Sequence, residues 1–170
     1  MKNGFFTSAT APVLMDGEVV SSTRIREALA SGNLPAAAGL LGRDFAIRGR
    51  VTRGAGLGAK LGFPTANIAT GHQQYPTDGV YAIQAAWKGE TYQGVANIGL
   101  RPTVSDDKQR MLEVHLFDFS ADLYDTEIEV AFLNYLRPEK KFENKDALCV
   151  QIREDVGAAR EWFQNRTAAA

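Results

Sequence analysis

The sequence has very little cysteine and no long apolar run. Cys149 is the only cysteine, so the chain cannot form an internal disulfide, and the thiols of a cysteine-rich metal site are missing. No stretch of about eighteen apolar residues could cross a membrane, and the N-terminus has no apolar segment of a secretory signal. These absences predict a protein of the cytoplasm, without a membrane-spanning segment.

The chain also has almost no net charge. Its 19 Lys and Arg residues against 20 Asp and Glu residues leave a net charge of -1, so no global field attracts nucleic acid or an anionic membrane. At 170 residues, 45% of them apolar, the chain has the length of about one domain and enough material for its core. We therefore expect one folded domain that binds neither nucleic acid nor a membrane.

The first part of the chain has a helical pattern. Residues 1–20 show weak periodicity and are expected to form an irregular lead-in. Residues 21–42 contain two short helical patterns, because Ser21–Thr23 can cap the first one and Pro35 suits the first turn of the second. Gly42 is a plausible end of this helical segment.

Residues 43–166 combine alternating, strand-like segments with one final helix. Apolar residues recur at steps of three or four from Leu148 to Phe163, which predicts a helix packed on the strands, and residues 167–170 are expected to form a tail. No helix separates the strands, which favours antiparallel pairing, and a closed barrel would leave no exposed edge. The expected fold is mainly β: a six-stranded antiparallel closed barrel with short N-terminal helices and a C-terminal helix packed on it. The predicted strands are Phe45–Thr52, Thr65–Ala69, Val80–Trp87, Tyr92–Ile98, Leu112–Phe119 and Glu127–Leu136.

A glycine-rich segment follows the first predicted strand. Its backbone could bend tightly and present N–H groups to a phosphate, or it could be a mobile hairpin connection. Both interpretations remain open from the glycine content alone. The segment contains four glycines and two basic residues: Arg53, Gly54, Gly56, Gly58, Lys60 and Gly62.

Two known phosphate-binding patterns do not fit this segment. A Walker A motif requires glycine directly before its lysine, whereas Ala59 separates Gly58 from Lys60. The permissive dinucleotide pattern fits the letters, but Pro64 would break the helix that this pattern needs. The segment is therefore neither a Walker A loop nor a Rossmann loop.

The residues after the glycines suggest a cation site. Pro64 leads into the next predicted strand, where the period of two places Thr65 and Asn67 on one face. A hydroxyl and an amide oxygen can help to hold Mg²⁺ together with ATP phosphates and water. The alternative is a Thr–Asn pair that satisfies backbone groups of a turn.

Several separated motifs, taken together, resemble the riboflavin kinase family in both order and spacing. The resemblance runs from about Gly42 to Phe163 and implies transfer of the ATP γ-phosphoryl group to the 5′-hydroxyl of riboflavin, which gives FMN and ADP. The alternative is a noncatalytic barrel that binds a flavin or a nucleotide. The motifs are Gly62–Asn67, Asp78–Ala82, Ala96–Thr103, Glu113–Phe119 and Leu136–Glu139.

The resemblance also implies roles for individual residues. Thr65 and Asn67 match the family's Mg²⁺–ATP ligands, Glu113 matches its catalytic base, and Arg137 is the best flavin contact beside Glu113. Without the family, Glu113 would be a solvated strand residue, since alternation places it on the face opposite the apolar residues of its strand. The expected nucleotide-binding residues are Gly54, Gly56, Gly58, Lys60, Gly62, Pro64, Thr65, Asn67 and Asp78.

Two further details concern neighbouring residues. Asp78 could contact the nucleotide or order the turn before Gly79, and a hydrogen-bonding role is favoured over acid–base catalysis for His115. Asp125 stands where the family usually has glycine, although aspartate tolerates a positive φ less readily.

The segment before the barrel resembles a second enzyme. Ser21–Arg26 resembles the end of the adenylyltransferase half of bacterial bifunctional FAD synthetases, but the catalytic histidine signature of that half has no counterpart. We therefore expect the kinase module of a bifunctional riboflavin kinase/FAD synthetase, with 21–42 as a remnant of the other half. FMN adenylyltransferase activity is expected to be absent.

Overall fold

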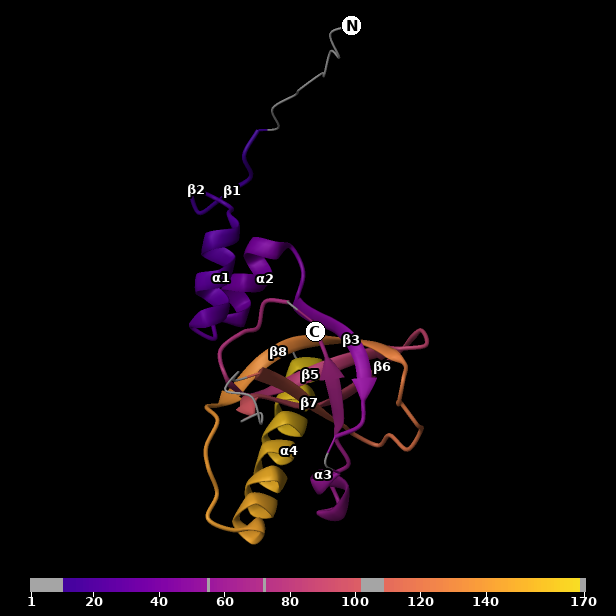
Figure 1. Ribbon diagram of the computed structural model, residues 1–170. Coiled ribbons are helices and arrows are strands. Elements are labelled where there is room, and N and C mark those ends of the chain that lie inside the picture. Colours follow the sequence, from indigo (N-terminus) through magenta and orange to yellow (C-terminus); the bar gives the residue numbers. More distant parts are fainter. Residues whose placement is uncertain (1–10, 55, 72, 102–108, 169–170) are drawn as a thin grey trace, which may run out of the picture.

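The structure is a computed structural model that describes residues 11–54, 56–71, 73–101 and 109–168. Eight strands and four helices follow one another along these residues, and Figure 1 shows their arrangement. The elements are β1 (Leu14–Met15), β2 (Glu18–Val19), α1 (Ser22–Ala30), α2 (Leu34–Leu41), β3 (Phe45–Thr52), α3 (Leu57–Lys60), β4 (Ala66–Ala69), β5 (Gly79–Trp87), β6 (Glu90–Arg101), β7 (Gln109–Leu116), β8 (Glu127–Arg137) and α4 (Lys145–Ala168).

Six of the strands close into a barrel in the order β3-β4-β7-β6-β5-β8. Every neighbouring pair is antiparallel, which confirms the predicted fold class. Antiparallel pairing agrees with the connections, since those that the structure describes contain no long crossover helix of the kind that a parallel pair requires. Among the described residues, α3 is the only helix inserted between barrel strands, and it has four residues.

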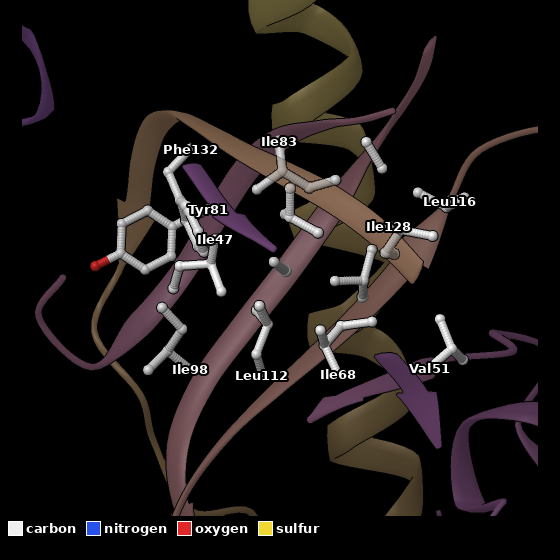
Figure 2. Close-up of a cluster of buried hydrophobic side chains, with 14 of the residues drawn as sticks. Ile47, Val51, Ile68, Tyr81, Ile83, Ile98, Leu112, Leu116, Ile128 and Phe132 are labelled. Atoms are coloured by element: carbon white, nitrogen blue, oxygen red, sulfur yellow. The ribbon is translucent and has the colours of Figure 1, made fainter. Parts of the chain in front are cut away.

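The core of the barrel is built from the inward faces of these strands. On β7, Leu112 and Val114 are fully buried, whereas Glu113 and His115 between and beyond them point to the outer face, as alternation predicts. Figure 2 shows the aliphatic side chains of this interior together with Tyr81, whose ring meets Phe132 edge to face at 5.2 Å. The interior is therefore filled with side chains.

The helices α1 and α2 lie together at one end of the barrel (Figure 1). Ser21 caps α1 by accepting a hydrogen bond from the backbone of Arg24, and Gly42 ends α2 with a φ of 69°, as expected. Leu29 and Leu34 belong to the same buried cluster as the barrel interior. The two helices are thus packed onto the barrel core. The domain boundary between residues 42 and 43 stays a prediction.

A small hairpin precedes these helices, inside the segment expected to be irregular. Leu14 pairs with Val19 and Met15 with Glu18. Asp16 and Gly17 form the turn with φ values of 55° and 79°, the conformation of a tight type I′ hairpin turn. The Asp-Gly pair was a local hairpin signal that weak periodicity on either side concealed.

The long helix α4 packs on the outside of the barrel, as predicted. Ala159 and Phe163 join Ala82, Val95 and Phe117 in a second buried cluster. Because Tyr81 and Ile83 fill the interior while Ala82 meets α4, strand β5 is buried on both faces. Within the described residues, none of the helices is both long enough and apolar enough to cross a membrane.

Asp125 is one of four non-glycine residues with a positive φ in the described part of the chain. Asp125, between β7 and β8, has a φ of 60°, which glycine adopts far more readily than aspartate. Its carbonyl oxygen accepts a hydrogen bond from the Arg50 guanidinium at 2.9 Å. The loop therefore keeps a left-handed residue at the position where aspartate replaces the family's usual glycine.

Candidate active site

Three polar residues form one row across neighbouring strands. Asn67 on β4 pairs with Glu113 on β7, and Glu113 in turn pairs with Asn97 on β6. Directly paired residues project from the same face of a sheet. Since Leu112 and Val114 occupy the interior, this row lies on the outer face of the barrel.

The glycine-rich segment covers the β4 end of that row. A Cβ atom at Gly54 would overlap the Asn67 amide, and one at Gly58 would overlap the Phe63 carbonyl oxygen and come within 3.0 Å of Thr65 Oγ1. Glycine is therefore required at both positions, because no side chain fits between the loop backbone and these two polar residues. The short helix α3, which was not predicted, runs through this loop.

Asn67 is buried in an unusual way. Its side chain is 4% exposed, and Asn67 Oδ1 has no hydrogen-bond partner among the described parts of the chain. A buried amide oxygen without a partner destabilises a folded protein by about 1–3 kcal/mol, so such an atom needs a separate explanation. Binding of a cation, or of a hydrogen-bond donor from a ligand, would give Asn67 Oδ1 a partner and explain its burial.

A cavity of about 300 Å³ lies between the outer face of the barrel and α4. We call it the barrel–helix pocket. Gly58, Thr65, Glu113 and Arg137 line it together, so four of the residues predicted for the site meet there. Its apolar walls come chiefly from Phe63, Val80, Val95, Phe142, Leu148 and Ile152.

Arg137 is held in this pocket by a buried carboxylate on α4. Arg137 Nε donates to Asp155 Oδ1 and Arg137 Nη2 donates to Asp155 Oδ2, both at 2.7 Å. Gln151, one turn earlier on the helix, donates to Asp155 Oδ1 at 3.1 Å. With Asp155 only 6% exposed, this two-pronged ion pair fixes the guanidinium and fastens α4 to the end of β8.

A second cavity, also of about 300 Å³, lies on the other side of Thr65. We call it the loop pocket. Pro64 and Thr65 form one side of it, and Phe119, Leu123 and Tyr124 form another. The Arg53 guanidinium lies over the Tyr124 ring at 4.7 Å, which places a positive charge near the glycine-rich segment. Thr65 thus lines both cavities.

The comparisons with known proteins identify the family. A family model described as riboflavin kinase matches residues 41–163. The chain belongs to the riboflavin kinase family. A bifunctional riboflavin kinase/FMN adenylyltransferase from Pseudomonas fluorescens is 46% identical over 160 residues, which cover 94% of this chain and 51% of that protein.

Two solved structures are similar to the fold. A crystal structure described as a macrolide-efflux protein from Streptococcus pneumoniae is 35% identical, with a TM-score of 0.80 over 89% of this chain and 50% of that one. A riboflavin kinase from Trypanosoma brucei shares the fold at 23% identity, with a TM-score of 0.50 over 70% of this chain and 79% of that one. The chain spans about half the length of the curated relatives that it matches, and this half contains the riboflavin kinase module.

Some residues expected from the riboflavin kinase motifs lie elsewhere. Asp78 lines neither pocket, and its buried Oδ1 lies 3.0 Å from Arg110 Nε in a half-buried ion pair. Gly56 and Gly62 have φ values of 66° and 84° and turn the loop backbone. The side chain of Lys60 is outside the described part of the chain.

Four polar residues of the barrel–helix pocket, Asn97, Glu139, Lys140 and Asp155, were not predicted as site residues. Asn97 lies within a motif of the resemblance, and the alternation of buried Ala96 and Ile98 around it would have pointed it to the outer face. Asp155 lies on the buried stripe of α4, four residues before Ala159. A carboxylate on an apolar stripe is the signal that could have identified it.

Proposed function

We propose that this chain is a riboflavin kinase that transfers the γ-phosphoryl group of ATP to the 5′-hydroxyl of riboflavin. The hydroxyl oxygen forms a bond to the γ-phosphorus, the bond to the β-phosphate oxygen breaks, and ADP leaves. The observation that carries the proposal is the position of Thr65 in the walls of two cavities, one of which contains Glu113. A donor and an acceptor could meet at such a shared wall.

The barrel–helix pocket suits the flavin. A flat tricyclic ring requires apolar walls, which Val95, Leu148 and Ile152 provide, and a few polar groups that orient it. The Arg137 guanidinium is held by Asp155 in a single geometry and supplies fixed donors. Riboflavin bound here would have its ribityl chain directed toward Glu113.

The loop pocket suits the nucleotide. Its apolar and aromatic lining fits a purine ring, and Arg53 and the glycine-rich backbone lie beside it. Gly54 and Gly58 allow the loop to approach Asn67 and Thr65 closely, which brings backbone N–H groups near the phosphates. The need for ATP as the donor also supports the predicted cytoplasmic location.

The chemistry of Thr65 and Asn67 fits a magnesium ion. Asn67 Oδ1 is buried and unpartnered among the described residues, and Thr65 Oγ1 lies under the same loop, so two neutral oxygens face one region. Bound Mg²⁺ would neutralise charge on the transferred phosphoryl group. We expect T65A and N67A each to weaken Mg²⁺–ATP binding in calorimetry, and unchanged affinity in both would contradict this assignment.

Glu113 is proposed as the catalytic base. Its position between Asn67 and Asn97 in the polar row places a carboxylate beside the proposed metal ligands, where it can accept the proton of the 5′-hydroxyl. E113Q preserves the shape and removes the proton acceptor. We expect FMN formation to fall by about 10²–10⁴-fold while riboflavin still binds.

The test is FMN formation from riboflavin, ATP and Mg²⁺, measured by chromatography, for the wild type, E113Q and E129Q. Glu129 is an exposed strand residue that pairs with Arg48 at the surface, so E129Q should retain wild-type turnover. Riboflavin and ATP binding without any FMN from the wild type would favour the noncatalytic barrel. Near-normal turnover of E113Q would remove Glu113 from its role.

We also propose that this chain does not make FAD. The curated relatives are bifunctional, but the histidine signature of the adenylyltransferase half has no counterpart in this sequence. Incubation of the chain with FMN, ATP and Mg²⁺ should yield no FAD, and the full-length Pseudomonas fluorescens relative serves as the positive control. FAD formation by this chain would contradict the proposal.

A further inference from the structure

The side chain of His115 extends the contact between the β4 segment and β7 to a residue that precedes the start of β4. The described register of these strands ends at Ala66 and Val114, one residue before His115. His115 Nδ1 lies 2.9 Å from the Pro64 carbonyl oxygen. A carbonyl oxygen only accepts, so Nδ1 carries the proton and donates it.

Two aromatic neighbours hold the His115 ring in place. The ring meets Phe63 edge to face at 5.7 Å and Phe117 at 6.1 Å. The Arg160 guanidinium covers the Phe117 ring, at 4.5 Å from the centre of that ring. The half-buried imidazole therefore has one orientation in the wall of the barrel–helix pocket.

The hydrogen bond between His115 and Pro64 lies next to Thr65 in the chain and can therefore fix the position of Thr65. Proline has no N–H group, so residue 64 can be tied to a neighbouring strand only through its carbonyl oxygen. Thr65 follows directly in the chain, and its hydroxyl faces the region of Asn67 under the glycine-rich loop. Glu113 lies two residues before His115 on the same face of β7. One strand therefore positions both the proposed catalytic base and the hydrogen bond to Pro64.

We propose that His115 is a positioning residue, whose Nδ1–H bond to Pro64 sets the place of Thr65 as a ligand for Mg²⁺–ATP. The inference rests on the proposed function, because it assigns a consequence to the metal–nucleotide site. The competing role is direct contact of the other ring nitrogen, Nε2, with a substrate. The two roles use different nitrogens and can be separated by substitution.

The experiment compares H115N, H115Q and H115A. The Asn amide nitrogen occupies nearly the place of Nδ1 and can still donate to Pro64, whereas the Gln amide nitrogen corresponds to Nε2 and cannot. We expect H115N to retain the KM for ATP within about twofold, and H115Q and H115A to raise it by about five- to tenfold, the effect of one lost hydrogen bond. The kcat and the KM for riboflavin should change less.

A binding measurement makes the test independent of turnover. Calorimetric titration of each variant with Mg²⁺–ATP, without riboflavin, should show the same order: wild type and H115N tight, H115Q and H115A weak. Equal affinities for H115N and H115Q, or H115N as weak as H115A, would overturn the proposal. Absence of FMN in the wild type alongside the expected binding order would instead reject the proposed kinase reaction and leave the positioning role supported.

A measurement on the unaltered chain covers the case in which a variant fails to fold. The chain has two histidines, so ¹⁵N spectra of the imidazole nitrogens can be assigned with few signals. In neutral His115 the proton should reside on Nδ1. A neutral form that carries its proton on Nε2 would exclude the bond to Pro64 and overturn the proposal.

Discussion

Removal of the Asp155 charge tests the link between α4 and the barrel. D155N changes one oxygen to nitrogen and keeps the shape of the side chain, but it leaves the Arg137 guanidinium without a counter-charge. Both partners are shielded from water, with side-chain exposures of 19% for Arg137 and 8% for Asp155. The remaining positive charge therefore cannot recover full hydration.

The magnitude follows from this burial. Breaking a buried ion pair by removal of one partner destabilises a protein by about 3–5 kcal/mol. The partial exposure of Arg137 lets its guanidinium recover some hydration, so we expect the lower value, about 3 kcal/mol. For a chain of this length, that loss corresponds to a decrease of about 6–12 °C in Tm.

The assay is urea and thermal unfolding of the ligand-free chain, followed by circular dichroism, with D118N as the matched control. Asp118 also pairs with α4, through Arg160 at 3.0 Å, but its side chain is 80% exposed. A surface pair of this kind contributes about 0–1 kcal/mol, so D118N should unfold nearly like the wild type. The two variants make the same chemical change and differ in burial.

The paired replacement R137M/D155L distinguishes lost pairing from lost packing. Apolar residues of similar volume can replace a buried ion pair with little loss of stability, so this variant should recover most of the loss of D155N. It should still bind riboflavin poorly, since the guanidinium is gone from the barrel–helix pocket. A D155N variant no less stable than D118N would refute the reasoning.

Three other predictions concern local geometry. G54A should reduce kcat/KM for ATP by about tenfold or more, because its Cβ would displace the Asn67 amide, whereas G157A, which meets no atom within 4 Å, should leave activity unchanged; steady-state kinetics of both variants checks this. D125G should raise the free energy of unfolding by about 0.5–1 kcal/mol, because it removes a side chain from a left-handed backbone position; an equal or lower urea midpoint would contradict it. Burial raises the pKa of Tyr81 well above its ordinary value of about 10, so at higher pH the unfolded chain loses a proton that the folded chain keeps, and stability falls as pH rises. Y81F loses the hydrogen bond to Thr77, which should lower its free energy of unfolding near neutral pH. From neutral pH up to about pH 11, its free energy of unfolding should then decrease less than that of the wild type. Urea midpoints that change in parallel for both chains would refute this.

The strands were predictable because their signals are local. Alternation along Leu112–Leu116 placed Glu113 and His115 opposite the core residues, and the structure has the same arrangement. The glycine-rich composition of this segment made α3 unpredictable, because glycine is a poor helix former. In addition, Gly56 and Gly62 turn the backbone on either side of this four-residue helix. The short hairpin before α1 was hidden for a different reason, because its strands have two residues each.

The sequence by itself determined the barrel class and the docked C-terminal helix, because periodicity and turn residues act over a few positions. The shared face of Thr65 and Asn67 stays a prediction, because β4 begins at Ala66, one residue after Thr65. Only the tertiary structure placed Asn97 beside Glu113, laid Gly54 over Asn67 and joined Arg137 to Asp155. Each of these contacts depends on strand register and on the docking of α4, which barrel closure and core packing set among residues far apart in the chain. Local patterns contain no measure of that register, so these contacts could not be predicted from them.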